Sequence, residues 1–295
     1  MLSKIAFFEN GSDRPDPAAE RARLLPALLS HLRSSDPDAG ATLAPGGTLG
    51  LCFDVDIAGK RQFLKSHLPS DAARASLAHE ADILLRLYGD TVVRKRFDVA
   101  MPDGTSRLCL LMPVLAPLTT PMQPEDAATM ARSWNGRLQG YRPDDSLEEY
   151  MTCAARAVAA LSGRNLLEDE TTADLRLLLS RLEDRLAGLP RLLCHGDFGP
   201  KNVMMNGDER LAIDWEDAFL GVAGYDYLYW LTFMENRPFL QCAAFGRTGL
   251  EPDIERAILV LVVLLKSYLA VCSGAYLNHA VSAQTRIAEV LELGR

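Results

Sequence analysis

The sequence lacks closely spaced cysteines. Metal knuckles and dithiol redox sites use pairs of cysteines a few residues apart. No such pair occurs among the 295 residues, so we expect buried thiols and neither a zinc site nor a dithiol site. The six cysteines are far apart along the chain: Cys52, Cys109, Cys153, Cys194, Cys242 and Cys272.

Basic residues are also fewer than acidic ones: the sequence has 31 basic and 39 acidic residues, which gives a net charge of -8. Affinity for nucleic acid comes from neutralising phosphates, so we expect no nucleic-acid partner.

Long apolar runs are missing too. The longest, 257–265, ends at Lys266, whereas a bilayer span needs about 20 residues. The apolar stretch 5–8 is too short for a secretory signal. We therefore expect a cytoplasmic protein with no membrane partner.

Composition and length indicate a globular protein with a sizeable core, since 48% of the residues are hydrophobic and 24% are charged. Residues 1–40 are rich in Pro, Asp and Ala and predict an N-terminal appendage with one helix at 17–32. Residues 41–115 predict two hairpins, with strands at 53–57 and 61–65 and at 92–100 and 107–115. One helix, 71–88, lies between the hairpins.

Residues 116–295 are mostly helical in pattern, with helices expected at 124–139, 146–163, 171–187, 224–236 and 251–293, the last broken near Gly274. The predicted fold class is therefore α+β, with a small β-rich lobe (41–115) before a larger helical lobe (116–295).

The segment 192–216, LLCHGDFGPKNVMMNGDERLAIDWE, carries the chemistry. Short apolar runs at 203–205 and 211–213 flank a polar loop and predict an antiparallel hairpin. In that register Asn202 falls opposite Asp214, and their oxygens are hard ligands that suit Mg²⁺. Asp197 precedes the hairpin and would lie near the metal without binding it. A carboxylate beside a metal, within reach of a substrate hydroxyl, is typical of phosphoryl transfer.

The spacing His195-x-Asp197, with Asn202 five residues later and Asp214 beyond the hairpin, agrees with the H-x-D-x-x-x-x-N pattern of kinases. HGDFGPKNVMM followed by LAIDWEDA resembles the catalytic core of the aminoglycoside phosphotransferase/choline kinase-like family. These small-molecule kinases are related to protein kinases and share their bilobal fold.

The resemblance implies a role for each residue. Asp197 orients or deprotonates the acceptor hydroxyl, His195 supports the loop, and Asn202 and Asp214 hold Mg²⁺. Asp226 resembles a later aspartate of the family that braces the catalytic loop. The expected cofactors are ATP, with GTP as an open alternative, and Mg²⁺.

The first lobe supplies a second pair. Lys65 ends a predicted strand, and Glu80 lies on the apolar face of the helix 71–88, where a carboxylate needs a partner. Kinases use such a strand lysine and helix glutamate to hold the α- and β-phosphates. A solvated lysine at a strand edge and a locally bonded glutamate are the plainer alternatives.

Two backbone segments complete the expected nucleotide site. Gly46, Gly47 and Thr48 lie in the turn where a kinase covers the phosphates, although paired glycines are also common in ordinary turns. Adenine would meet the chain after the last strand of the small lobe. Because Pro113 has no N–H, Val114 or Leu115 must donate there.

The acceptor is a small molecule of unassigned identity. Residues 116–295 hold 17 basic and 25 acidic residues, and this excess favours an amino-bearing acceptor or merely reflects solvated helix faces. An aromatic run offers either a cation–π wall or a packed core stripe. Its members are Phe219, Tyr225, Tyr227, Tyr229, Trp230 and Phe233.

Three functions are compatible with a kinase-like chain. The first is an enzyme that phosphorylates a small-molecule hydroxyl, as a monomer or homodimer. The second is a catalytically silent, nucleotide-binding module that acts through a protein partner; the presence of Lys65, Asp197, Asn202 and Asp214 argues against it. A protein kinase is disfavoured because Gly196 replaces the Arg of H-R-D and no D-F-G or A-P-E follows.

Overall fold

The computed structural model describes residues 1–11, 15–45, 49–143, 145–243 and 245–293, with the side chains of 241–243 left aside. The chain folds as two compact units. The sheet unit consists of Gly11–Pro117 and Met204–Glu216. The helical unit consists of Met1–Asn10, Leu118–Val203 and Asp217–Arg295. Residues 1–40, expected as one appendage, are thus divided between the two units.

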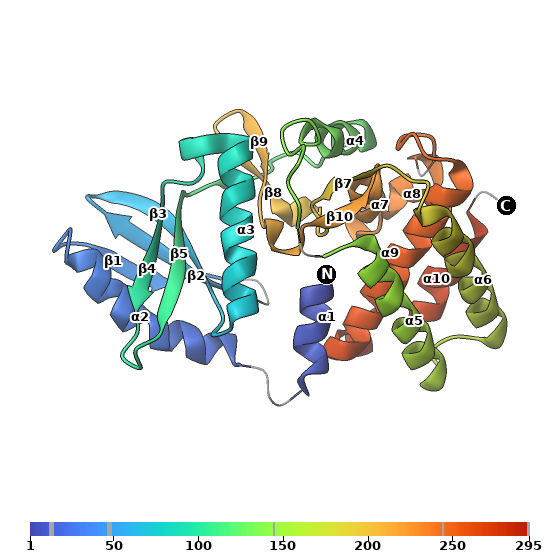
Figure 1. The fold of residues 1–295 in the computed structure, drawn as a ribbon, viewed down its shortest axis with the longest axis horizontal. Coiled ribbons are helices and arrows are strands. Elements are labelled where there is room, and N and C mark those ends of the chain that lie inside the picture. The colour runs from blue at the N-terminus through green and yellow to red at the C-terminus, as the bar shows by residue number, and fades with distance from the viewer. Residues whose placement is uncertain (12–14, 46–48, 144, 244, 294–295) are drawn as a thin grey trace. The chain divides into compact units, whose positions relative to one another are not determined.

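The sheet unit is built on a five-stranded antiparallel sheet of order β1-β2-β3-β5-β4 (Figure 1). Helix α2 (Pro17–Arg33) packs along β1 and β2, and α3 (Asp71–Tyr88) packs on β3 and β5. Helix α3 begins where predicted because the Ser70 side chain accepts a hydrogen bond from the amide of Ala73. The strands are β1 (Gly40–Leu43), β2 (Gly50–Ile57), β3 (Lys60–His67), β4 (Lys95–Ala100) and β5 (Ser106–Pro113).

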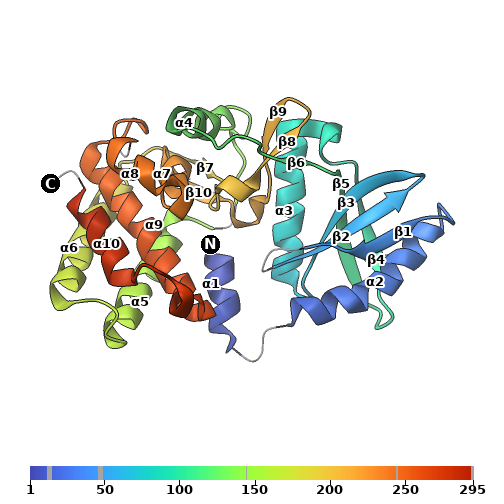
Figure 2. The same ribbon diagram turned by 180° about the vertical axis from the view of Figure 1, so that it is seen from behind.

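A second, three-stranded sheet in the same unit has the order β6-β8-β9 (Figure 2). Strands β8 (Val203–Asn206) and β9 (Glu209–Ala212) are neighbours, which confirms the hairpin predicted there. Strand β6 (Ala116–Pro117) pairs with β8 through Ala116–Met205 and Pro117–Met204. The sheet therefore fixes the chain directly before Asp214.

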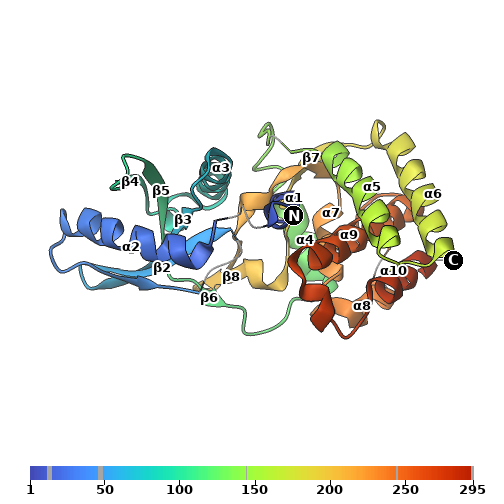
Figure 3. The same ribbon diagram turned by 90° about the horizontal axis from the view of Figure 1, so that it is seen from below.

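The helical unit has helices at each predicted place (Figure 3). The helices predicted at 124–139 and 224–236 end earlier, at Ser133 and Leu231, and the helix Arg237–Ala243 was not predicted. A two-stranded sheet pairs β7 (Arg191–Cys194) with β10 (Phe219–Val222), and these strands lie before and after residues 195–218. The helices are α4 (Pro124–Ser133), α5 (Leu147–Gly163), α6 (Asp169–Leu186), α7 (Tyr225–Leu231), α8 (Arg237–Ala243), α9 (Pro252–Ser273) and α10 (Ala283–Glu292).

Helix α9 is apolar well beyond the uninterrupted run 257–265. Its 22 residues have a mean hydropathy of 2.0 over the most apolar window, which satisfies the length and composition of a membrane span. However, 72% of that window is buried inside the protein, against α1, α5, α6, α7 and α10. Such burial is typical of the central helix of a packed core.

The structure confirms the α+β class, with a small antiparallel part and a larger helical part. Helix α1 (Leu2–Glu9), which was not predicted, is short, and its polar residues interrupt the apolar pattern. The five cysteines whose side chains are described are unpaired, and four of them are buried, as expected.

Candidate active site

Lys65 and Glu80 form the ion pair expected in the sheet unit. The Nζ of Lys65 lies 2.7 Å from Oε2 of Glu80, and both side chains are buried. The register of β3 places Lys65 opposite Cys52 and Leu110, and α3 packs on this strand. Gly50 is close by, since a Cβ added there would lie 3.1 Å from the Cε of Lys65. The plainer alternative of a solvated edge lysine is excluded by this geometry.

Two further carboxylates share the same ammonium group. Asp214 is ion-paired with Lys65, and Oε2 of Glu216 lies 3.3 Å from its Nζ. Burial alone would lower the pKa of Lys65, but the three carboxylates outweigh it and hold the pKa well above its usual value. Burial raises the pKa of Glu80, against the opposing effect of Lys65.

The three acids also form a group suited to a metal ion. Glu80, Asp214 and Glu216 each offer a carboxylate oxygen, and these oxygens lie within 4.8 Å of one another. Three carboxylates exceed the charge of one ammonium, so the cluster keeps negative charge for a divalent cation. Glu216 was assigned no role from the sequence; its position two residues after Asp214 was the available signal.

The backbone at Asp214 is strained. This residue has a φ of +66°, an uncommon conformation for a residue with a side chain. Its neighbourhood is fixed on both sides: the Tyr88 hydroxyl accepts from the amide of Ala212 at 2.9 Å, and Ser76 donates to the carbonyl of Glu216 at 2.9 Å. Strain of this kind persists where the surrounding structure imposes it, and it is concentrated at functional sites.

The His195–Asp197 loop in the helical unit rests on Asp226. The amides of His195 and Gly196 donate to the Asp226 carboxylate at 2.9 and 3.1 Å. Burial raises the pKa of Asp226 to about 7, although these two hydrogen bonds favour the charged form. The structure thus places Asp226 as the brace that the resemblance implied. His195 is fully buried, and its Nδ1 accepts from the amide of Asp197 at 3.3 Å, which fits its expected supporting role.

Gly196 is the residue that the tight loop requires. Its φ is +79°, and a Cβ added there would lie 2.0 Å from the carbonyl oxygen of Asp217. No other residue fits this position without moving the backbone. The Gly between His195 and Asp197 is therefore a packing requirement of the loop.

Asp197 has a donor at each carboxylate oxygen. The Tyr229 hydroxyl donates to Oδ1 at 2.7 Å, and Nζ of Lys4 lies 2.5 Å from Oδ2. Burial raises the pKa of Asp197, but Lys4 and the amino group of Met1 together outweigh this effect, so the net pKa is below the usual value. A buried aspartate, Asp217, lies beside it, and its Oδ2 is 3.4 Å from the same Lys4 nitrogen.

Asn202 closes the turn at the end of the loop. It ends a short 3₁₀ helix, Pro200–Asn202, and its side-chain nitrogen donates to the backbone carbonyl of Asp197 at 2.8 Å. This bond leaves the side-chain oxygen as the atom for a metal. Asn202 belongs to the helical unit and Asp214 to the sheet unit. Their pairing around a metal stays a prediction.

The two backbone segments expected to bind nucleotide differ in what the structure shows. Gly46, Gly47 and Thr48 lie outside the described residues. Val114 and Leu115 lie between β5 and β6, after the last strand of the five-stranded sheet, and Val114 is 46% exposed. This position agrees with the segment expected to meet adenine, and the binding role stays a prediction.

The aromatic run is mostly core. Phe219, Tyr225, Tyr227 and Trp230 are buried, and Tyr150 stacks on Phe219 with ring centroids 4.2 Å apart. This packing favours the core stripe over a ligand wall for these four rings.

Tyr229 and Phe233 instead face a lysine of the chain itself. The Nζ of Lys266 lies 3.9 Å from the centroid of the Tyr229 ring and 3.4 Å from that of Phe233. It also donates to the Thr232 hydroxyl at 2.7 Å. Burial lowers the pKa of Lys266 well below its usual value. The faces of these two rings are therefore covered by an amino group of the chain itself.

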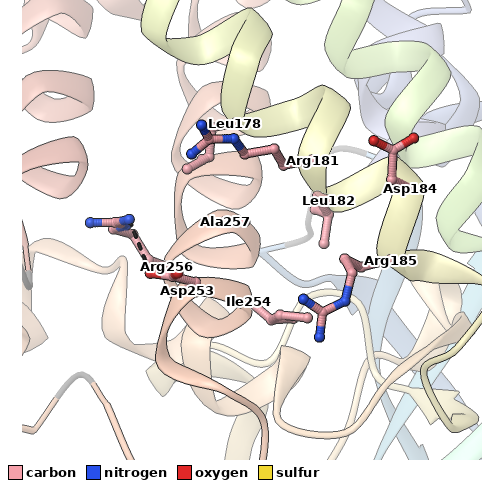
Figure 4. A pocket seen from close by; sticks show the side chains of 9 residues that line it. All are labelled: Leu178, Arg181, Leu182, Asp184, Arg185, Asp253, Ile254, Arg256 and Ala257. Atoms are coloured by element: carbon pink, nitrogen blue, oxygen red, sulfur yellow. Dashed lines mark hydrogen bonds and ion pairs between the residues drawn. The ribbon is translucent and has the colours of Figure 1, made fainter.

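A pocket of about 250 Å³ lies between α6 and α9 in the helical unit. Figure 4 shows Arg181 and Arg185 of α6 beside Ile254 and Ala257 of α9. None of the residues predicted for the site lines it.

Three residues around Asp197 were not predicted from the sequence: Lys4, Asp217 and Tyr229. Tyr229 was noted only as an aromatic, although its hydroxyl was a possible donor. Asp217 follows Glu216 directly and was a visible acid. Lys4 gave no signal, because 193 residues separate it from Asp197.

Three solved structures with a similar fold are kinases of small molecules. Aminoglycoside phosphotransferase APH(4)-Ia is 15% identical with a TM-score of 0.59, over 92% of this chain and 99% of that one. A microcompartment-associated aminopropanol kinase is 16% identical, with a TM-score of 0.56 over 90% and 92% of the two chains. Choline kinase from Cryptosporidium parvum Iowa II is 12% identical, with a TM-score of 0.55 over 90% and 94%.

A thermostable mutant of APH(4)-Ia was solved as a ternary complex with ADP and hygromycin B. The sequence has no detectable match among curated proteins. The model of the phosphotransferase enzyme family matches residues 13–258, which include the Lys65–Glu80 pair and the His195–Asp197 loop. The chain therefore belongs to the phosphotransferase enzyme family, has the protein-kinase-like fold of its structural neighbours, and is a small-molecule kinase.

Proposed function

We propose that this protein transfers the γ-phosphoryl group of ATP, with Mg²⁺, to a hydroxyl group of a small molecule. The buried ion pair of Lys65 with Glu80 is the observation that carries the proposal, because it retains a charged lysine on the sheet at a large desolvation cost. Phosphoryl transfer is catalysed mainly by positioning and charge neutralisation, and a fixed ammonium serves both.

The sheet unit contributes the nucleotide side of the reaction. Lys65 binds the α- and β-phosphates, with Glu80 holding its ammonium in place. The backbone at Val114 or Leu115 donates to the adenine or guanine ring, and Gly46, Gly47 and Thr48 cover the phosphates. ATP is the proposed nucleotide and GTP is the alternative. A direct competition between the two nucleotides distinguishes them.

The helical unit contributes the acceptor side. Oδ2 of Asp197 accepts the hydroxyl proton while the Tyr229 hydroxyl holds Oδ1, so the carboxylate keeps one orientation. His195 and Asp226 fix the backbone of the loop by accepting hydrogen bonds from its amides. Each of these residues contacts Asp197 or its immediate neighbours.

The residues present fit a magnesium ion. Asp214 and Glu216 offer carboxylate oxygens in a cluster that one lysine leaves negatively charged, and the Asn202 side chain offers an amide oxygen. Asn202 and Asp214 would hold the ion, with Glu216 as a further donor. When bound, Mg²⁺ supplies positive charge to the phosphate oxygens.

An amino-bearing acceptor, such as an amino alcohol, is the class that the acidic groups favour. The ammonium of Lys4 contacts both Asp197 and Asp217, so this part of the helical unit already accommodates a primary amine. The aromatic rings do not add to this support, because Lys266 occupies the faces of Tyr229 and Phe233.

An acceptor panel tests the function. Purified protein is incubated with radiolabelled ATP and Mg²⁺ against 1-amino-2-propanol, choline, hygromycin B and a neutral sugar, with EDTA as the metal control. We expect transfer to at least one hydroxyl compound, abolished by EDTA, and highest with an amine. Nucleotide binding without transfer to any acceptor or to water would favour the silent module instead.

A further inference from the structure

Helix α1 belongs to the helical unit, although the chain continues from it directly into the sheet unit. It packs against α9 (Figures 1 and 3), and its Met1 and Ile5 side chains are 1% exposed. At the far end of α1, Glu9 accepts from the Tyr268 hydroxyl at 2.6 Å and lies 3.6 Å from Arg156. The helix is thus anchored along its length.

The near end of α1 reaches the carboxylate proposed to act on the acceptor. Lys4 contacts Asp197 and Asp217, the Ser3 hydroxyl donates to Asp217, and the Met1 amino group is ion-paired with Asp217. One short helix therefore places three donors on two neighbouring acids. Such a concentration of contacts is more than the packing of α1 on α9 requires.

Each carboxylate oxygen of Asp197 thus already accepts from a donor of the chain. Tyr229 takes Oδ1 at 2.7 Å and Lys4 takes Oδ2 at 2.5 Å. A carboxylate that is to accept a proton from a hydroxyl must lie within hydrogen-bond reach of that hydroxyl. A hydroxyl that approaches Oδ2 therefore competes with the Lys4 ammonium for this oxygen.

Lys4 is the donor that can leave. Its side chain is 16% exposed, whereas Tyr229 is 4% exposed and is fixed between Tyr225 and Phe233. A second ammonium in the place of Lys4 would keep Asp197 and Asp217 paired with positive charge, so such an exchange leaves neither carboxylate unpaired.

We propose that α1 is a self-inhibitory segment whose Lys4 side chain occupies the acceptor position at Oδ2 of Asp197. The proposal rests on the proposed function, since it assigns Asp197 to the acceptor. An acceptor binds by displacing Lys4, with or without withdrawal of α1. An amino-bearing acceptor has an advantage here because its ammonium replaces the lost charge beside Asp217.

Two variants of the full chain weaken the contact from opposite ends. Lys4→Met removes the ammonium and keeps the length of the side chain, and Glu9→Ala releases the far anchor without touching Asp197. Arg176→Met is the matched control, because it removes one exposed positive charge from α6, away from α1. Circular dichroism checks that each variant is folded.

The first readout is hydrolysis of Mg·ATP without any acceptor, which needs only water at Asp197. We expect Lys4→Met and Glu9→Ala to raise the rate about three- to tenfold, and Arg176→Met to leave it unchanged. The second readout is the KM for 1-amino-2-propanol, which we expect to fall by a similar factor in both variants while the KM for ATP stays within twofold.

The outcomes separate the inference from the function on which it rests. If wild-type protein transfers phosphate and neither variant hydrolyses ATP faster than wild type, α1 is not inhibitory and the inference is overturned. If no form transfers phosphate to an acceptor or to water, the proposed function fails and the inference fails with it. Activation by both variants but not by Arg176→Met supports the inference.

Discussion

The ammonium of Lys65 lies 2.7 Å from the carboxylate of Glu80, and both groups are buried in the sheet unit. A buried charge is tolerated only when it is paired, so each residue fixes the other. With Asp214 and Glu216 on the same nitrogen, the pair becomes the centre of an acidic cluster. We expect both nucleotide and metal binding to depend on this cluster.

Replacement of the lysine tests its role toward the nucleotide. We expect Lys65→Ala to raise the KM for ATP at least tenfold, because the phosphates lose a fixed positive charge and three acids are left unbalanced. Lys60→Ala, at the exposed start of the same strand, is the control and should leave the KM unchanged. Equal KM values for both variants would remove Lys65 from the nucleotide site. Initial-rate kinetics with varied ATP give the comparison.

Glu216 tests the metal assignment. We expect Glu216→Gln to raise the Mg²⁺ concentration that gives half-maximal activity by about three- to tenfold, because one carboxylate is lost from the cluster. The matched variant Glu209→Gln removes an exposed acid of β9 and should behave as wild type. An unchanged magnesium requirement in Glu216→Gln would show that Glu216 serves Lys65 alone.

Gly196 tests the packing of the catalytic loop. In Gly196→Ala the new Cβ would lie 2.0 Å from the carbonyl oxygen of Asp217, at a φ of +79°. We expect the free energy of unfolding to fall by about 2–4 kcal/mol, the sum of a collision and a left-handed backbone. Gly207→Ala has a φ of +62° and nothing within 4 Å, so it should lose only about 1 kcal/mol. Equal losses in urea unfolding would contradict the close approach.

Asp226 predicts a dependence of stability on pH. Burial raises its pKa to about 7 in the folded protein, whereas an unfolded aspartate has a pKa of about 3.9. The folded state therefore binds the extra proton between these values, and stability falls as pH rises toward 7. We expect wild type to lose about 2–3 kcal/mol more than Asp226→Asn between pH 5 and pH 8. Parallel pH profiles of the two proteins in urea unfolding would show that Asp226 is ionised throughout.

The parts of the site that local pattern determines were predictable. Glu80 was found because a carboxylate on an apolar helix face needs a partner, and Lys65 ended the neighbouring strand. The hairpin β8–β9 followed from two apolar runs around a polar turn. In each case the residues lie close in sequence or in one regular element.

The parts that depend on distant packing were not predictable. Lys4 meets Asp197 across 193 residues, and no periodicity reports such a contact. The aromatic run was compatible with a wall for a cationic ligand or with a core stripe, and α9 brings Lys266 onto Tyr229 and Phe233. Which cation fills an aromatic face is decided by tertiary packing, which the spacing of the rings does not encode.

Asp197→Asn tests the central claim most directly, since this carboxylate is proposed to accept the acceptor proton. The variant keeps a side-chain oxygen and nitrogen of the same shape but is a far weaker base. Its kcat for phosphate transfer should fall at least a hundredfold, with ATP affinity within a few-fold of wild type in a direct binding measurement. Wild-type turnover in Asp197→Asn would contradict the account.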